Sequence, residues 1–271
     1  MTRYTSRSTH DRLFASLDRT LAALFAGHSF TEPARAHRFG HDDHDDADAE
    51  SAAADVLAAV REAAGAVHDR LAHDNDVFAV ELLGATGAGK TALIESLLGP
   101  DGPFTEDRVG VVTGDVAGTD DADRLREYAE RVVNVTTGKD CHLNPERLDD
   151  ALDEFDLTRL DVLLVENVGN MVCPADFPLG ADARAVVVSP TEGDDVVRKH
   201  PMLFQACDLA VVNKVDVADA VGADVDRMVA DAERVAPDTP VVRTSATTGT
   251  GLDALATRLD RRRGRAHTHH G

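Results

Sequence analysis

Residues 77–98 read VFAVELLGATGAGKTALIESLL, and this stretch decides the fold. An apolar strand runs directly into a glycine-rich loop at 84–91 (GATGAGKT), and a helical segment follows. This is the GxxxxGK[ST] pattern in its strand–loop–helix context. Glycines are needed there because backbone N–H groups must converge on phosphate oxygens, and side chains would obstruct that approach. The stretch therefore predicts a phosphate-binding P-loop; the alternative is an ordinary glycine-rich turn before a helix.

Short β-branched runs alternate with helical stretches from this point onward. We expect seven strands between residues 77 and 245, in the runs VFAVELL, VGVVTG, VVNVT, DVLLVEN, RAVVVS, DLAVVN and PVVRTS. Buried strands that alternate with helices are typical of an α/β fold with a mostly parallel sheet and helices on both faces. The sequence thus predicts an α/β P-loop NTPase with a seven-stranded sheet.

The region before the P-loop contains two further helical patterns, at 11–26 and 52–73. Between them lies a polar stretch with too little apolar content to form a core. We therefore expect an N-terminal helix plus an acidic, histidine-containing linker at 1–50. A nucleotide-binding domain with a leading helix would occupy 51–262, and a disordered tail 263–271.

The predicted P-loop supplies the groups that bind a nucleotide triphosphate. The ammonium group of Lys90 would contact the β- and γ-phosphates, and the Thr91 hydroxyl would ligate Mg²⁺. The N-terminus of the following helix adds its dipole. The phosphates are expected to contact the whole loop: Gly84, Ala85, Thr86, Gly87, Ala88, Gly89, Lys90 and Thr91.

An NKxD element follows a late strand and comprises Asn213, Lys214 and Asp216. The Asp216 carboxylate can accept hydrogen bonds from both the ring N–H and the exocyclic amine of guanine, which adenine does not offer, and such sites reject analogues strongly. Farther along, a backbone amide of Ser245 or Ala246 could reach the guanine carbonyl. The pattern predicts GTP and GDP rather than adenine nucleotides; taken alone it could be a polar loop.

Candidate hydrolytic residues stand at the ends of two other strands. Glu166 ends the strand DVLLVEN, and Gly169 follows where many GTPases carry DxxG. In that position the acid reaches Mg²⁺ through water, and the glycine amide senses the γ-phosphate. Asp115, at the end of the second strand, would position the attacking water or Mg²⁺, or simply cap a loop. With Lys90 these residues form the predicted catalytic set.

Two of the three cysteines fall in loops near the same edge of the predicted sheet. Cys141 precedes His142, and Cys173 follows Glu166 in the same loop. Thiolate and imidazole ligands suit Ni²⁺ or Zn²⁺, although separated cysteines are more often small buried apolar residues. Cys207, in the run FQACDLAVV, fits that apolar role.

Composition limits the partners and the compartment. The chain of 271 residues has 49 acidic against 28 basic residues and a net charge of −21, which disfavours nucleic acid. No apolar run is long enough to span a membrane, and three cysteines fit a reducing cytoplasm. Lysine is scarce beside arginine and aspartate, so we also expect a halophilic cytosol, where salt screens self-repulsion.

From the P-loop onward, over roughly residues 77–250, the chain resembles the HypB GTPases of [NiFe]-hydrogenase maturation. The stretches that carry the resemblance are GATGAGKT, GDVAGTDDADR, TTGKDCHL, ENVGNMVCP, SPTEGDD and NKVD. The segments TGxxCHL and ENVGNxVCP are the most specific, because they join GTPase switch elements to cysteines. The resemblance places the chain in the branch of signal-recognition and maturation-factor GTPases.

The resemblance implies a slow GTPase that forms a homodimer when GTP is bound. It implies a metal site of Cys141, His142 and Cys173, from which nickel passes to a second nickel-insertion factor or to the immature hydrogenase large subunit. Two departures stand out. Gly118 replaces the family's usual threonine, and no cysteine precedes Cys141, so the N-terminal nickel motif of some relatives is absent.

Three other functions compete with this one. A urease-type accessory GTPase would usually carry Cys-Pro-His, whereas Cys173-Pro174 is followed here by Ala175. A metal-storage protein would have a vestigial nucleotide site, which the intact Lys90 argues against. A nucleotide-dependent scaffold, with the helix at 11–26 as a docking arm, is compatible with GTP hydrolysis.

Overall fold

The computed structural model describes residues 43–115, 118–138, 142–172 and 175–269. The helix expected at 11–26 lies outside these residues. The chain divides into two units between Ala58 and Ala59, and the nucleotide-binding fold belongs to the second unit, residues 59–271.

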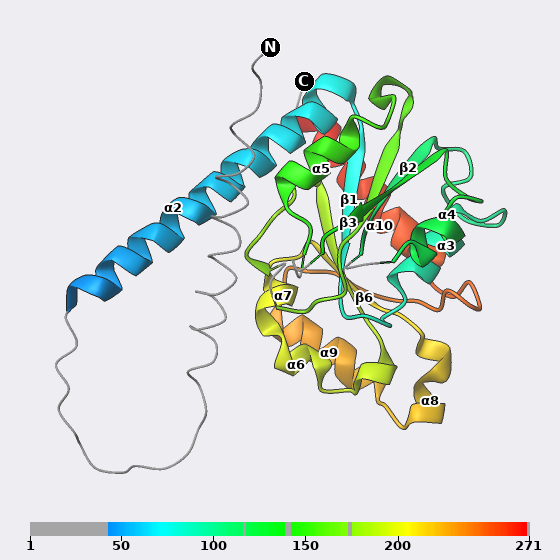
Figure 1. Cartoon of the computed structure of the whole chain (residues 1–271). Coiled ribbons are helices and arrows are strands. Elements are labelled where there is room, and N and C mark those ends of the chain that lie inside the picture. The colour runs from blue at the N-terminus through cyan, green and yellow to red at the C-terminus, as the bar shows by residue number, and fades with distance from the viewer. Residues whose placement is uncertain (1–42, 116–117, 139–141, 173–174, 270–271) are drawn as a thin grey trace, which may run out of the picture. The chain divides into compact units, whose positions relative to one another are not determined.

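A parallel sheet of seven strands forms the centre of this unit (Figure 1). The strands are β1 (Phe78–Leu83), β2 (Val109–Asp115), β3 (Arg131–Thr136), β4 (Val162–Glu166), β5 (Ala183–Val188), β6 (Leu209–Val212) and β7 (Val241–Arg243). Their order across the sheet is β3-β2-β4-β1-β5-β6-β7, with every pairing parallel. All seven predicted strands are therefore confirmed, and so is the α/β P-loop fold.

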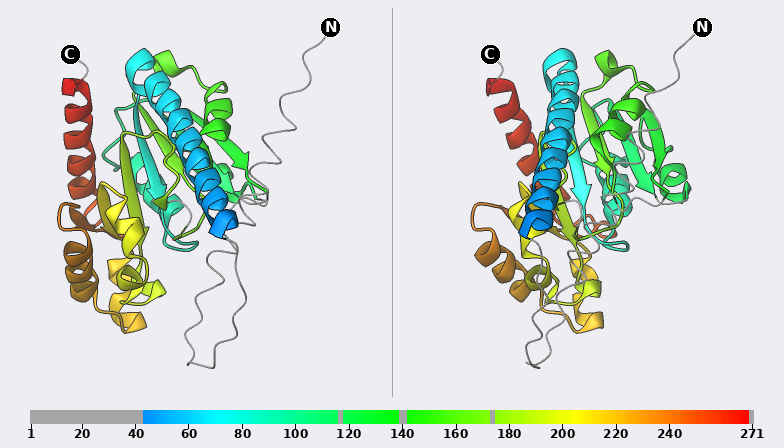
Figure 2. Two further views of the ribbon diagram at one scale, coloured as in Figure 1. Left: turned by 90° about the vertical axis from the view of Figure 1, so that its left-hand side faces the viewer. Right: turned by 60° about the vertical axis from the view of Figure 1, so that its left-hand side comes forward.

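Helices connect the strands and cover both faces of the sheet. The longer ones are α2 (Asp43–His68), α3 (Lys90–Leu98), α5 (Pro145–Leu152), α9 (Val225–Val235) and α10 (Leu252–His269). The shorter ones are α4 (Asp120–Leu125), α6 (Val196–Lys199), α7 (Pro201–Gln205) and α8 (Ala218–Val221). Single turns complete the set: η1 (Asp69–His73, a π-helix), η2 (Leu157–Arg159), η4 (Pro190–Glu192) and η5 (Val215–Val217). The left-hand view of Figure 2 shows α10 (red) and α5 (green) on opposite sides of the strands.

The apolar core follows from the alternation of side chains along each strand. In β1, Val80 and Leu82 point into one cluster, which α3 and α10 complete, whereas Ala79 points into a second cluster on the other face. The end of α2, η1 and α5 cover that second cluster, and α6, α7 and α9 cover a third beside it. Because both faces are buried, the strands read as continuous apolar runs.

The carboxyl ends of all the strands meet at one edge of the sheet, since every strand is parallel. The chain leaves β1 at this edge, with β4, β2 and β3 on one side of it and β5, β6 and β7 on the other. Such a reversal of strand order is where open α/β sheets bind ligands. The P-loop, which follows β1, therefore lies at the position that the topology favours for a site.

Both ends of the predicted domain differ from expectation. Helix α2 begins at Asp43, so the last residues of the expected linker are helical, and the aspartates there are favourable to the N-terminal end of the helix dipole. Helix α10 continues to His269, so residues 263–269, which were expected in the tail, are helical in the structure. Arg263 holds this segment by an ion pair of 2.9 Å with Asp107, and arginines near a helix C-terminus are favourable to its dipole.

None of the helices among residues 43–115, 118–138, 142–172 and 175–269 has the length and apolarity needed to span a lipid bilayer.

A matched pair of glycines tests how α2 is fixed to the sheet. Gly180 has φ +93°, and a Cβ there would lie 2.2 Å from the carbonyl oxygen of Ala64 in α2. We expect Gly180→Ala to lower the free energy of unfolding by about 2 kcal/mol or more, through strain and loss of this close packing. Gly65→Ala, on the exposed side of the same helix with open space around it, should raise it by about 0.5–1 kcal/mol. Urea unfolding measures both, and equal effects would contradict this account.

Candidate functional site

The loop between β1 and α3 has the backbone conformation of a phosphate cradle. Gly84 has φ +138°, and a Cβ there would lie 2.1 Å from the carbonyl oxygen of Val187 in β5. Gly89 has φ +94°, and its Cβ would lie 2.6 Å from Nδ2 of Asn213. Both positions therefore require glycine on two grounds, conformation and space. The backbone N–H groups of this loop and the N-terminus of α3 together suit the negative oxygens of a phosphate chain.

Lys90 is held inside this loop. Its side chain is buried, and Nζ donates hydrogen bonds of 3.2 Å to the carbonyl oxygens of Gly84 and Ala85. Burial lowers the pKa of Lys90, and the nearby Glu166 carboxyl opposes that shift. The loop thus places a positive charge beside its backbone N–H groups. This is an arrangement that binds polyphosphate.

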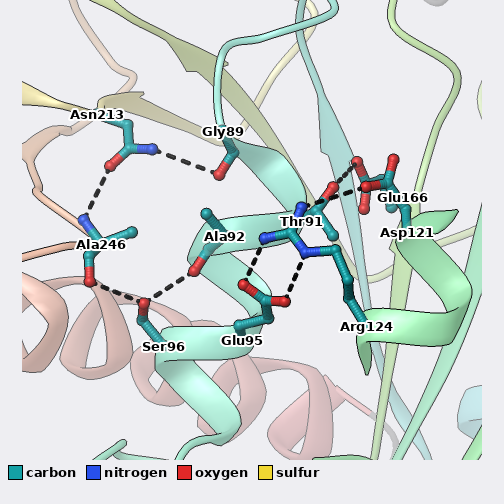
Figure 3. A network of polar contacts seen from close by, with 10 residues as sticks. All are labelled: Gly89, Thr91, Ala92, Glu95, Ser96, Asp121, Arg124, Glu166, Asn213 and Ala246. Carbon is teal, nitrogen blue, oxygen red and sulfur yellow. Dashed lines mark hydrogen bonds and ion pairs between the residues drawn. The ribbon is translucent and has the colours of Figure 1, made fainter. Parts of the chain in front are cut away.

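Glu166 ends β4 beside the first residues of α3. The Thr91 hydroxyl donates to its Oε1 at 2.9 Å, as Figure 3 shows, and the residue is 6% exposed. The other carboxyl oxygen, Oε2, has no hydrogen-bond partner among the described residues. Burial raises the pKa of Glu166 to about 7, against the attraction of Lys90. A buried carboxyl with one unpartnered oxygen next to the P-loop threonine fits an oxygen-ligated divalent cation such as Mg²⁺.

The loop that follows Glu166 is clasped to the P-loop. The backbone N–H of Asn170 donates to the Gly84 carbonyl at 3.1 Å, and the two residues form an isolated antiparallel bridge. Gly169 lies so close that a Cβ on it would come within 2.1 Å of Thr86 Oγ1 and 2.7 Å of Thr86 N. The P-loop and the loop after β4 are therefore in direct backbone contact.

Asp115 lies at the end of β2, as predicted, and is partly buried. A Cβ at position 118 would lie 2.6 Å from its Oδ2, so Gly118 makes room for this carboxylate. Asn134 fixes the turn by donating from Nδ2 to the Gly118 carbonyl at 3.0 Å. This packing gives a local reason for glycine where the family usually carries threonine. The role of Asp115 toward water or Mg²⁺ stays a prediction.

Two acidic side chains join the site that the sequence did not single out. Asp121, in the first turn of α4, raises the pKa of both Lys90 and Glu166 and lies beside Glu166 in Figure 3. Glu192, in η4, has its pKa raised to about 7 by burial, against the attraction of Lys90 and Lys214. Both occur within stretches that resemble the family, GDVAGTDDADR and SPTEGDD. Nothing in their spacing distinguishes them from neighbouring acids; only the fold does.

Helix α4 is tied to α3 by a charged pair that also reaches Asp121. Arg124 donates to both carboxyl oxygens of Glu95, at 2.9 and 2.6 Å, and lies 3.5 Å from Asp121 (Figure 3). A two-point arginine–carboxylate contact fixes orientation as well as distance. It holds α4 next to the P-loop helix.

The NKxD element connects the P-loop with the loop after β7. Asn213 is fully buried; its Nδ2 donates to the carbonyl of Ala88 at 3.2 Å, and its Oδ1 accepts from the Thr244 hydroxyl at 3.0 Å and from the Ala246 N–H at 3.4 Å. The asparagine thus acts as a strut between loops. The Ala246 carbonyl in turn accepts from Ser96 in α3 at 3.0 Å (Figure 3).

The other residues of the predicted base site lie around this strut. Lys214 has φ +58°, and its Nζ donates to the Gly87 carbonyl at 2.7 Å, so its stem lies over the P-loop. Asp216, in η5, is exposed and open to a ligand. Ser245 is buried, and its N–H donates to the Thr250 carbonyl at 2.9 Å. The fold thus brings all of the predicted nucleotide-binding segments to one edge of the sheet.

Only part of the predicted transition-metal site can be placed. Cys141 and Cys173 lie outside the described residues. The ring of His142 is stacked on that of Phe177, with centroids 4.7 Å apart and planes at 23°. Among the described residues, no three His, Cys, Asp or Glu side chains are grouped so that they could hold a metal. The contact with Phe177 nevertheless places His142 against the segment that follows Cys173.

Cys207 has the apolar role predicted for it. It is 6% exposed, belongs to the cluster under α7 and α9, and has its pKa raised to about 12 by burial. A thiol held neutral in this way is a poor metal ligand, because ligation requires the thiolate.

The fold and the site define a P-loop nucleotide-binding protein of the class that carries a guanine-type NKxD element. The family model described as "CobW/HypB/UreG, nucleotide-binding domain" matches residues 78–243. A probable hydrogenase maturation factor HypB of Methanocaldococcus jannaschii is 44% identical over 186 residues, or 69% of this chain and 83% of the relative. HypB of Azotobacter vinelandii is 37% identical over 207 residues, or 73% of this chain and 67% of the relative.

Two solved structures agree. The crystal structure of HypB from Archaeoglobus fulgidus has a TM-score of 0.68 at 39% identity and covers 77% of this chain and 99% of its own. HypB from Helicobacter pylori in complex with nickel has a TM-score of 0.70 at 30% identity, over 76% and 95% of the two chains. The chain belongs to the HypB hydrogenase maturation factors and is a GTPase of the maturation-factor branch.

The contact between Gly169 and the P-loop gives a direct test of the clasp. In Gly169→Ala the methyl group meets the backbone of Thr86, which cannot rotate away, so the loop must shift by roughly 1 Å. We expect GTP turnover to fall by about 100-fold or more, the scale that a misplacement of this size produces. Gly264→Ala, in open space on α10, is the matched control and should turn over GTP like the wild type. Comparable turnover in the two variants would show that the close contact is not needed.

Proposed function

We propose that this protein uses GTP binding and hydrolysis to hold and then deliver Ni²⁺ during maturation of [NiFe]-hydrogenase. The observation that carries the proposal is the position of one loop. It begins at Glu166, is clasped to the P-loop through Gly169, and continues to Cys173 within four residues of that glycine. Its continuation reaches Phe177, against which His142 is stacked. A change in the nucleotide would therefore act on the loop that carries a metal ligand.

The chain's own residues divide the work of hydrolysis among them. Lys90 binds and orients the β- and γ-phosphates, and Gly169 contacts the γ-phosphate through its backbone N–H. Asp115 positions the attacking water. Thr91 and Glu166, with Asp115, would hold Mg²⁺, which supplies positive charge against the charge that develops on the transferred phosphoryl group. The buried, unpartnered Oε2 of Glu166 supports this assignment.

The transferred ion would be bound by Cys141, His142 and Cys173. Three ligands leave a four-coordinate ion one position short. The same loop of a second copy could fill that position across a two-fold axis, which would make the GTP-bound homodimer the nickel-holding state. Zn²⁺ suits the same donors and would compete with Ni²⁺. Hydrolysis would loosen the loop and release the ion to a second nickel-insertion factor or to the immature hydrogenase large subunit in the cytoplasm.

The relatives support this reading. Two Helicobacter pylori proteins, 34% identical over 169 residues, are named hydrogenase/urease maturation factors, and the H. pylori structure contains nickel. In this chain the residue after Cys173-Pro174 is Ala175, not the histidine usual in urease accessory GTPases. We therefore propose hydrogenase as the target.

Nickel affinity in the two nucleotide states tests the proposal. We expect Ni²⁺ to bind at least fivefold more tightly with a non-hydrolysable GTP analogue than with GDP, as coupling between two sites requires. Cys173→Ala should lose about tenfold or more in affinity with the analogue, because a thiolate ligand is removed. Cys207→Ala is the matched control and should bind like the wild type, since that thiol is buried in the core. Equal affinities with GDP and the analogue would refute the coupling.

Base selectivity provides a separate test of the nucleotide site. In Asp216→Asn, an amide replaces the carboxylate that accepts two hydrogen bonds from guanine. We expect GTP affinity to fall by at least about 100-fold and xanthosine triphosphate to bind better than GTP, because xanthine offers a carbonyl to the new amide donor. Asp219→Asn, at an exposed position in α8, should keep the wild-type preference. If Asp216→Asn retained that preference too, the base would be recognised elsewhere.

A further inference from the structure

Asn167 is a buried residue whose side-chain oxygen and nitrogen both form hydrogen bonds. It is 1% exposed and lies between Glu166 and the loop that contacts the P-loop. Its Oδ1 accepts from the backbone N–H of Leu143 at 2.9 Å and of Val168 at 2.8 Å. Its Nδ2 donates to Glu81 Oε1 at 2.7 Å, and its backbone N–H donates to the Leu82 carbonyl at 3.0 Å. One side chain thus joins the loop after β4 to the loop that carries His142.

A buried carboxylate is the partner of this amide. Glu81 lies in the middle of β1, is fully buried, and accepts at its second oxygen from Arg184 Nε at 3.0 Å. The Arg184 Nη1 donates in turn to the Ala206 carbonyl at 3.1 Å. Because the backbone N–H groups of Leu143 and Val168 can only donate, Oδ1 of Asn167 must face them, and Nδ2 is left to donate to Glu81. A flipped amide would oppose oxygen to oxygen and N–H to N–H.

The segment that contains Leu143, whose N–H donates to Asn167, is also constrained. Leu143 follows His142 directly and is fully buried. Its side chain packs against the end of β2, where a Cβ at Gly114 would lie 2.7 Å from its Cγ. His142 itself is stacked on Phe177. Leu143 and His142 are therefore held between the end of β2 and Phe177, and the hydrogen bond to Asn167 is a further tie on the same segment.

We infer that Asn167 is a positioning residue that transmits the nucleotide state from Gly169 to the segment carrying His142. The path is short: one residue, Val168, separates Asn167 from Gly169, and one hydrogen bond joins Asn167 to Leu143. In the GTP-bound state the γ-phosphate keeps the Gly169 loop against the P-loop and the Leu143 amide in its hydrogen bond. In the GDP-bound state the loop loosens and this hydrogen bond opens more often. The consequence for nickel rests on the proposed function; the movement of the segment does not.

Hydrogen exchange of the peptide that begins at His142 and continues through α5 measures this transmission. The full chain is compared with Mg²⁺ and GDP, and with Mg²⁺ and a non-hydrolysable GTP analogue. In the wild type we expect exchange at the Leu143 amide to be about five- to tenfold slower with the analogue, the equivalent of one hydrogen bond. In Asn167→Ala we expect the same fast exchange with both nucleotides.

A charge-swapped double variant provides the rescue. Combining Asn167→Asp with Glu81→Gln keeps the net charge and the acceptor toward Leu143. The new amide at 81 donates to the new carboxylate at 167 and still accepts from Arg184, so every bond is retained with one donor and acceptor exchanged. We expect this variant to regain the nucleotide-dependent exchange. Every buried hydrogen-bonding group keeps a partner, but a neutral amide replaces the carboxylate that pairs with Arg184. Urea unfolding therefore establishes first that the double variant is folded.

The outcomes separate the inference from the proposed function. Nucleotide-dependent exchange that persists in folded Asn167→Ala, or is lost in the folded double variant, overturns the inference, as does a wild-type segment that ignores the nucleotide. Nickel affinity is measured on the same samples. If exchange depends on the nucleotide through Asn167 while nickel affinity does not, the positioning role holds and the proposed coupling to nickel fails.

Discussion

The contact between the P-loop and the loop after β4 is the constraint on which the rest of the site depends. Gly169 approaches the backbone of Thr86 so closely that no side chain fits, and Asn170 donates to the Gly84 carbonyl. Gly84 is itself pressed against β5. Interfaces packed this tightly change by discrete rearrangement and not by gradual deformation. A γ-phosphate bound in the P-loop therefore has a mechanical route to whatever the second loop carries.

The electrostatics of the site point the same way. Glu166 and Glu192 both have pKa values raised to about 7 by burial, and Lys90 has its pKa lowered. Each charge costs free energy inside the protein, and the structure concentrates them at one edge of the sheet. Such groups cluster at functional sites because a ligand can complete their pairing. A bound cation would pair with the carboxylates at this edge, and a bound polyphosphate would pair with Lys90.

The sheet and the nucleotide-binding segments could be predicted because each is specified by a short, contiguous stretch of sequence. Apolar runs bounded by turns gave all seven strands, and the glycines of the P-loop are where close approach demands them. The helical continuation at 263–269 was not predicted, and the contact of Arg263 with Asp107 is one between residues far apart in the chain that local sequence does not reveal. Asp121 and Glu192 were missed for the same reason. An acid becomes part of a site only when folding buries it beside another charge.

The pairing of Glu81 with Arg184 inside the protein could not be predicted from the sequence. A carboxylate inside a central strand costs desolvation, and replacing such a pair with apolar residues often stabilises a protein. In this structure the pair is connected to the orientation of a neighbouring side chain. The carboxylate accepts from the Asn167 amide, and the oxygen of that amide accepts from the Leu143 N–H. Burial of Glu81 thus costs free energy of folding, but the residue fixes the hydrogen-bonded connection between the loop that contains Gly169 and the segment that contains His142.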